Sequence, residues 1–157
     1  MNRTVTTIGN RLSLRPPQRK SLEILNWVME HAHPDDKRDA ADVLASVQAE
    51  FKTVEDFERS FPSICFALAT GVGKTRLMGA FIAYLHLEHG VRNFFVLAPN
   101  LTIYDKLLGD FSPASPKYVL QGIAEFAVKS PMLVTGDNFE ERPQVMRLFE
   151  KDDVVIN

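Results

Sequence analysis

Apolar side chains recur at helical spacing through the first third of the chain. Residues 18–29 predict an amphipathic helix that ends before Pro34, because proline cannot continue a helix. Residues 36–51 predict a second helix, and the acidic side chains at its start suit the positive end of the helix dipole. Thr53 is placed to cap a short third helix over residues 53–61. This part of the chain is therefore expected to be helical.

From residue 62 onward, short apolar runs alternate with helical patterns. Strands are expected at residues 63–69, 93–98, 117–120, 132–135 and 154–156. Helices are expected at residues 74–89, 101–109 and 141–151, with Asn100 as an N-cap and Gly90 and Gly109 as stops. A continuous apolar strand is typical of a sheet covered on both faces. This order predicts an α/β fold with a mostly parallel sheet flanked by helices.

The composition fits a chain with one buried core. The 157 residues are 45% hydrophobic, and 18 basic against 20 acidic side chains leave a net charge of −2, with no basic field to attract nucleic acid. No apolar run approaches the roughly 18 residues that span a bilayer, so we expect a cytoplasmic protein with no membrane role. The single cysteine, Cys65, excludes an internal disulfide and is expected to be buried in its strand. Phe57, Phe61 and Phe66 are expected to pack in the core or between elements rather than to stack on bases.

A glycine-rich loop follows the first expected strand and opens onto a helix. It reads Ala69-Thr70-Gly71-Val72-Gly73-Lys74-Thr75. Glycines let the backbone turn tightly, so that successive N–H groups point at phosphate oxygens beside the helix N-terminus. In this pattern Lys74 supplies a cation for the β- and γ-phosphates, and the Thr75 hydroxyl is placed to ligate Mg²⁺. The loop therefore predicts a binding site for the phosphates of a nucleotide.

Leu68 stands five residues before Gly73, where the general phosphate-loop pattern has a further glycine. This departure counts against small kinases and GTPases, which keep that glycine. It is tolerated where the loop is shortened to T-G-x-G-K-T.

Longer stretches around the loop resemble one family. LATGVGKTRLMGAFIAYL, FFVLAPNLTIYDKLLGDF and MLVTGDNFE look like the restriction subunit of type III restriction–modification enzymes, which belong to the DEAD/DEAH-box-like, superfamily-two helicases. The likeness covers most of residues 10–157. It implies a RecA-like motor domain that binds ATP and Mg²⁺ and, in the whole enzyme, couples translocation on double-stranded DNA to endonucleolytic cleavage. A separate modification (methyltransferase) subunit is the implied partner.

The resemblance also implies roles for single residues. In LRPPQRKSLEIL, Gln18 matches the glutamine that reads adenine; by itself it would be a solvated residue at a helix start. The stretch from Thr70 to Arg76 matches the nucleotide-binding motif, with Lys74 as its catalytic cation. Residues that match DNA-backbone contacts follow two of the strands: Pro99, Asn100, Thr102, Thr135 and Gly136. From spacing alone, Asn100 is equally a helix cap, and the last two residues equally form a turn after a strand.

Hydrolysis in this class needs a further pair of carboxylates, an Asp-Glu at the end of an apolar strand beside the loop. Asp152 and Asp153 precede their strand, and Asp137, which follows one, is the only stand-in. In the resembled family the acidic motif lies beyond the point where this chain stops. We therefore expect residues 1–60 to be a helical segment that carries Gln18, and residues 61–157 to be a partial motor domain.

Three functions stay open on the sequence alone. The first is the ATP-binding portion of a DNA motor, and the second is a nucleotide-binding module without hydrolysis. The third is a small phosphoryl-transfer kinase that uses Asp137, which Leu68 and the lack of an arginine-rich lid disfavour.

The apolar strand expected at residues 64–69 would expose one edge if the acidic-motif strand were not beside it. We therefore expect the isolated chain to be poorly soluble or only marginally stable. Thermal unfolding followed by circular dichroism, with the mass measured by light scattering, tests this. A cooperative transition from a monomer would contradict it.

Overall fold

The computed structural model describes residues 2–34, 38–139 and 154–156. Its helices are α1 (Arg3–Arg11), α2 (Pro16–His31), α3 (Ala40–Glu50), α4 (Lys74–His89), α5 (Leu101–Phe111), α6 (Ala124–Val128) and α7 (Gly136–Phe139). Its strands are β1 (Asn93–Phe94), β2 (Met132–Leu133) and β3 (Val155–Ile156). The described part is therefore a mixed α/β structure that is mostly helical. The helix predicted at residues 141–151 and the pair Asp152-Asp153 lie outside the described residues.

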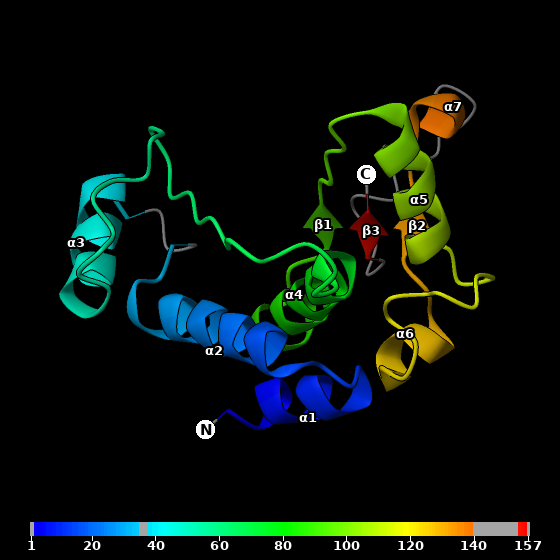
Figure 1. Cartoon of the computed structure of the whole chain (residues 1–157), viewed down its shortest axis with the longest axis horizontal. Helices are drawn as coiled ribbons and strands as arrows, with labels where there is room; N and C mark the ends of the chain where they lie inside the picture. The colour runs from blue at the N-terminus through cyan, green and yellow to red at the C-terminus, as the bar shows by residue number, and fades with distance from the viewer. Residues whose placement is uncertain (1, 35–37, 140–153, 157) are drawn as a thin grey trace.

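The three strands form a small parallel sheet in the order β1-β3-β2 (Figure 1). Val155 of β3 lies opposite Asn93 on one side and Met132 on the other. The parallel arrangement confirms the predicted sheet, although each strand is only two residues long. Side chains of α5 face the sheet around a small hollow that Leu107, Leu133 and Ile156 help to line.

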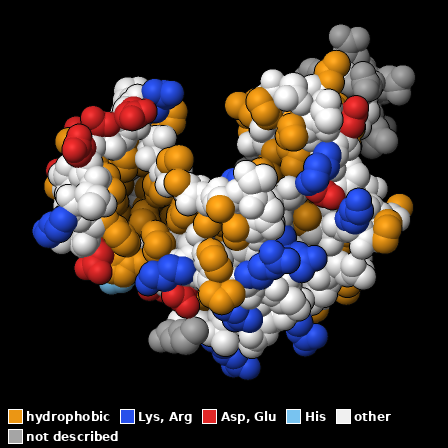
Figure 2. All heavy atoms as spheres, viewed as in Figure 1, with side chains coloured by type: hydrophobic (Ala, Val, Ile, Leu, Met, Phe, Trp, Pro, Cys, Tyr) orange, Lys and Arg blue, Asp and Glu red, His pale blue; other side chains and the backbone are white. Residues whose placement is uncertain are grey.

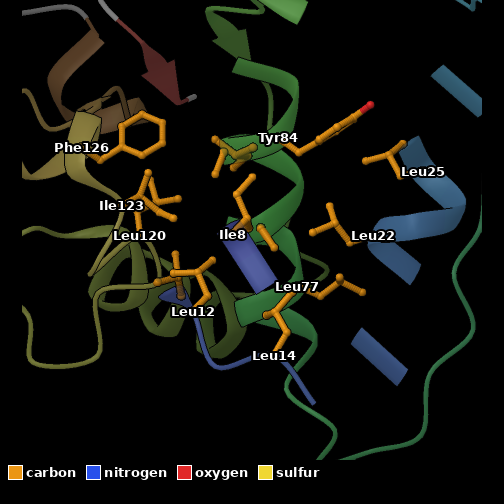
Figure 3. Close-up of a cluster of buried hydrophobic side chains, with 14 of the residues drawn as sticks. Ile8, Leu12, Leu14, Leu22, Leu25, Leu77, Tyr84, Leu120, Ile123 and Phe126 are labelled. Atoms are coloured by element: carbon orange, nitrogen blue, oxygen red, sulfur yellow. The ribbon is translucent and has the colours of Figure 1, made fainter. Parts of the chain in front are cut away.

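Helix α4 lies at the centre of the main core. Leu77, Ala80 and Ala83 are buried between α1 and α2 on one side and the chain around residues 119–126 on another (Figure 3). Tyr84 has no exposed surface, and its hydroxyl donates to Asn26 Oδ1 at 3.1 Å. Burial, with the nearby Glu30 and Glu88 carboxylates, raises the pKa of this hydroxyl well above its usual range. Gly90 ends α4 in the left-handed conformation, as predicted.

Helix α1 completes this core, although the helical spacing of its apolar residues was not singled out in the sequence. Asn2 caps it, because its side-chain oxygen accepts hydrogen bonds from the Thr4 and Val5 N–H groups. Val5, Ile8 and Leu12 point into the core. The basic start of the chain is thus a packed helix.

A second core cluster joins α3 to the end of α2. Val28, Val43, Val47 and Phe57 are buried there, and Figure 1 shows α3 set apart from α4 and the sheet. Helix α3 begins at Ala40 rather than at residue 36, because the Asp39 carboxylate accepts from the Ala41 N–H and caps it there.

The strand predicted at residues 63–69 is wrong. This segment runs without pairing from α3 back to α4, and Cys65 is exposed rather than buried. Ile64 is 40% exposed, and Phe66 is only partly buried, against Phe81 of α4. The physical reason is that no described strand lies beside the segment to satisfy its main-chain groups, since β1 pairs with β3 alone.

The next apolar run is also less covered than predicted. Only Asn93–Phe94 of the strand expected at residues 93–98 pairs in the sheet, and Phe95 and Leu97 are 70% and 75% exposed. They alternate with Phe94, Val96 and Ala98, which are partly buried against the main core, so Phe95 and Leu97 lie on the outer face of this run. Helix α5 then runs to Phe111, past the stop predicted at Gly109.

Two further short elements differ from their predictions. Residues 53–61 form turns instead of a helix, because Glu58 adopts a positive φ of 52° that a helix cannot contain. Phe57 reaches the second cluster, but Phe61 is 58% exposed rather than in the core. Residues 117–120 turn back on the main core instead of forming a strand, and the Val119 N–H bonds to the Asp110 carbonyl of α5. Among the helices described, none has the length and apolarity needed to cross a bilayer.

Leu22→Ala should destabilise the fold by about 2–5 kcal/mol, because the deleted atoms leave a cavity at a side chain with no exposed surface. Leu97→Ala removes the same atoms from a side chain that is 75% exposed and should cost well under about 1 kcal/mol. Denaturant unfolding of both variants measures the difference. Equal costs would show that the core around α4 is not packed as described.

Candidate functional site

The glycine-rich loop forms a tight turn that leads directly into the first residue of α4, Lys74. Gly71 has a φ of 81° and Gly73 a φ of 92°, both in the left-handed region that only glycine enters without strain. Thr70 precedes them in the turn, and Val72 is half-buried between them. The first N–H groups of a helix have no partner within that helix, so the loop presents donors beside a positive dipole end. This is the local geometry that an anion needs.

Three alternate carbonyl groups of the loop accept hydrogen bonds from basic or amide side chains. Lys74 Nζ donates to the Ala69 carbonyl at 3.3 Å. Arg15 Nη1 donates to the Gly71 carbonyl at 3.3 Å, and Gln18 Nε2 to the Gly73 carbonyl at 2.8 Å. The bonds from Arg15 and Gln18 hold the loop to the start of α2, 56 and 55 residues earlier in the chain. Lys74 itself is exposed and therefore accessible to a ligand.

Gln18 is only 1% exposed, so the interpretation of this residue as a solvated helix start is wrong. Its Oε1 accepts from the Arg15 N–H at 2.7 Å, which caps α2 while Nε2 reaches the loop. Pro16 and Pro17 set the backbone for this arrangement, because proline is favoured in the first helical turn. One side chain thus fixes the start of α2 and the end of the glycine loop.

Thr75, the predicted Mg²⁺ ligand, is half-buried in the first turn of α4. Its Oγ1 accepts a hydrogen bond from Lys106 Nζ of α5 at 3.1 Å. The same ammonium group lies 2.6 Å from Asp110 Oδ2, one turn further along α5. The Lys106 ammonium group therefore lies at the Thr75 hydroxyl.

Arg76 follows Thr75 but points elsewhere. Its Nη1 donates to the Leu12 carbonyl at 3.3 Å, at the end of α1. The side chain also lines a hollow of about 350 Å³ together with Arg11 and Lys117. The structure therefore does not bring the Arg76 side chain onto the glycine loop with Lys74 and Gln18, and its predicted nucleotide contact stays a prediction.

The residues predicted to touch DNA lie at the carboxyl ends of β1 and β2. Asn100 caps α5, because its Oδ1 accepts from the Ile103 N–H at 3.0 Å, and Pro99 and Thr102 beside it are exposed. Thr135 donates its N–H to Asn138 Oδ1 at 2.8 Å, and Gly136 begins α7. Both groups meet at one end of the sheet, since Ala98, Tyr104 and Thr135 line a common hollow there (Figure 1). The cap and the turn are confirmed; contact with DNA stays a prediction.

Basic and acidic side chains are separated across the face in Figure 2. Lys and Arg gather around the middle of the molecule, whereas Asp and Glu gather over α3 and the chain that follows it. Arg15, Lys74 and Lys106 contact the glycine loop, and Lys106 also pairs with Asp110. Within the described residues, no group of three or more His, Cys, Asp or Glu side chains could hold a metal ion. Only the main chain of Asp137 is described, in α7.

Two residues of this site were missed in the sequence. Arg15 carries a weak signal, because it occupies the N-cap position before Pro16-Pro17, where a basic residue is unusual. Lys106 carries none, since its contact with Thr75 depends on how α5 packs beside α4.

A parallel sheet next to a helix that begins at a glycine loop places the chain among the mixed α/β proteins. The family described as type III restriction enzyme, res subunit matches residues 11–153, and the chain belongs to that family. This confirms the resemblance seen in the sequence. No curated protein and no solved structure matches the chain.

Gly73→Ala should destabilise the chain more than Gly71→Ala. Both substitutions force alanine into a left-handed conformation, at about 1–2 kcal/mol each. At Gly73 the added Cβ would also lie 2.7 Å from Gln18 Nε2, whereas at Gly71 it meets nothing within 4 Å. Chemical denaturation of the two variants measures by how much the loss of unfolding free energy at Gly73 exceeds the loss at Gly71.

Gln18→Ala is the matched test of that excess. Combined with Gly73→Ala it should remove the clash, so the double variant should lose less stability than the sum of the two single variants. Strict additivity would mean that Gln18 does not lie against Gly73.

Proposed function

We propose that this chain is the ATP-binding portion of an ATP-dependent DNA translocase, the helicase-like subunit of a type III restriction–modification endonuclease. The observation that carries the proposal is the glycine loop, with Gly71 and Gly73 left-handed immediately before the 16-residue helix α4. Such a loop binds phosphate groups through main-chain N–H donors and a helix dipole. Membership of the res-subunit family supports the assignment.

Within this site, Lys74 would neutralise the β- and γ-phosphates of ATP, and Gln18 would contact the adenine. Each Gln18 amide atom already has one partner, yet an amide oxygen has a second lone pair and an amide nitrogen a second hydrogen. Its amide thus has capacity for hydrogen bonds to a base, but with only 1% of Gln18 exposed the glycine loop would have to move aside to admit one. Thr70, Val72 and Arg76 would complete the nucleotide contacts.

Magnesium would be held by the Thr75 hydroxyl, an oxygen ligand of the kind that Mg²⁺ prefers. When bound, the metal would screen the charge of the phosphates. Residues 61–157 would then form a partial motor domain, and residues 1–60 a helical segment that carries Gln18.

DNA contact would use the exposed turn at Pro99, Asn100 and Thr102 and the turn at Thr135 and Gly136. Turns of this kind position a protein on the phosphate backbone without reading bases. Sequence recognition would then belong to a modification subunit, a partner that the family supports. The alternative is a nucleotide-binding module that does not hydrolyse ATP; a small kinase is disfavoured by Leu68.

Lys74→Ala should weaken binding of a fluorescent ATP analogue at least tenfold, because a charge-assisted bond to phosphate contributes about 1.5–3 kcal/mol. Lys52→Ala is the matched control, since Lys52 is exposed in the chain after α3. Fluorescence titration measures both. If wild-type protein binds no nucleotide, or if both variants bind as it does, the proposed function is wrong.

Hydrolysis then separates the candidate functions. ATP turnover by this chain should be measured with and without double-stranded DNA. DNA-stimulated turnover supports the motor, whereas nucleotide binding with no turnover supports the binding module. Phosphoryl transfer without DNA by the chain would favour the kinase.

A further inference from the structure

We propose that Lys106 is a phosphate-binding residue of the nucleotide site, where its ammonium group takes the place of a divalent cation at Thr75 and supports binding of metal-free nucleotide. The inference rests on the proposed nucleotide binding at the glycine loop. It adds to that site a residue of α5, a helix that begins 27 residues after Lys74.

The geometry gives Lys106 two partners at once. Its Nζ lies 3.1 Å from Thr75 Oγ1 and 2.6 Å from Asp110 Oδ2, so one ammonium group bridges α4 and α5. The Lys106 side chain is 57% exposed, whereas that of Asp110 is 10% exposed. The carboxylate is therefore the fixed partner, and the lysine is the part that a ligand can reach.

The contact with Thr75 uses the oxygen that a metal would need. Lys106 donates into a lone pair of Oγ1, and a magnesium ion at the same hydroxyl would lie within a few ångströms of the ammonium charge. Two cations so close repel each other strongly. Metal and Lys106 therefore exclude each other at Thr75.

A nucleotide without metal needs additional positive charge from the protein. Its phosphates carry their full negative charge, and Lys74 is one lysine that already contacts the loop. Besides Lys74 and Arg15, Lys106 supplies a further cation next to the loop, on a flexible stem that can follow a phosphate. When metal binds instead, Asp110 retains the displaced ammonium group, because the two are one helical turn apart in α5.

The test is the affinity for a fluorescent ATP analogue, measured once with Mg²⁺ and once with a chelator. Lys106→Met should lower the metal-free affinity about five- to tenfold, which corresponds to the loss of one partly exposed charged contact. Affinity with Mg²⁺ should be unchanged or rise, because the competing charge is gone. Lys106→Arg keeps the charge and should restore most of the metal-free binding.

Thr75→Val is expected to do the reverse, with weaker binding in Mg²⁺ and little change in the chelator. Lys52→Met, far from the loop, serves as the matched control in both conditions. The double variant Lys106→Met/Asp110→Asn also removes the carboxylate that Lys106→Met leaves unpaired. It should again lower the metal-free affinity and leave the affinity with Mg²⁺ unchanged or higher. Thermal melting of both variants checks that they fold like the wild type.

Equal losses in both conditions, or no change in either, would overturn the inference while leaving the proposed function intact. A wild-type chain that binds no nucleotide in either condition would overturn both. A metal-free loss that Lys106→Arg fails to restore would also count against a charge-based role.

Discussion

The burial of α4 is the constraint on which the rest of the structure depends. Its inner side chains, Leu77, Ala80, Ala83 and Tyr84 among them, are enclosed by α1, α2 and the chain near residue 120. This packing fixes the axis of the helix and therefore the place where the glycine loop must end. The hydrogen bond from Gln18 to the Gly73 carbonyl then ties that end to α2. The N-terminal helices therefore hold the glycine loop in place, and the strands of the sheet come later in the sequence.

Helices were predicted from the sequence more faithfully than strands, for a physical reason. A helix satisfies its main-chain groups within itself, so apolar spacing and caps such as Asn100 and Gly90 were enough to place α4 and α5. A strand needs a neighbour. Residues 63–69 have the composition of a buried strand, yet no described strand lies beside them, and they remain extended and exposed.

In the candidate site, too, features set by neighbouring residues were predictable from the sequence, whereas contacts between distant segments were not. The glycines at 71 and 73 and the cap at Asn100 follow from neighbouring residues, and the structure confirms their conformations. The burial of Gln18, the bond from Arg15 to the loop and the contact between Lys106 and Thr75 join segments 31 to 56 residues apart. No spacing within one element encodes such contacts, since they arise only when α2, α4 and α5 pack together.

The stacking of Trp27 on His31 has a practical consequence for spectroscopy. The ring centroids are 4.6 Å apart with nearly parallel planes, and Phe51 meets the indole edge-on at 5.2 Å. Trp27 is the only tryptophan of the chain. Intrinsic indole emission therefore reports whether α3 is docked on α2, in a cluster distinct from the core around α4. An emission change on adding nucleotide would show that the loop and this outlying helix communicate.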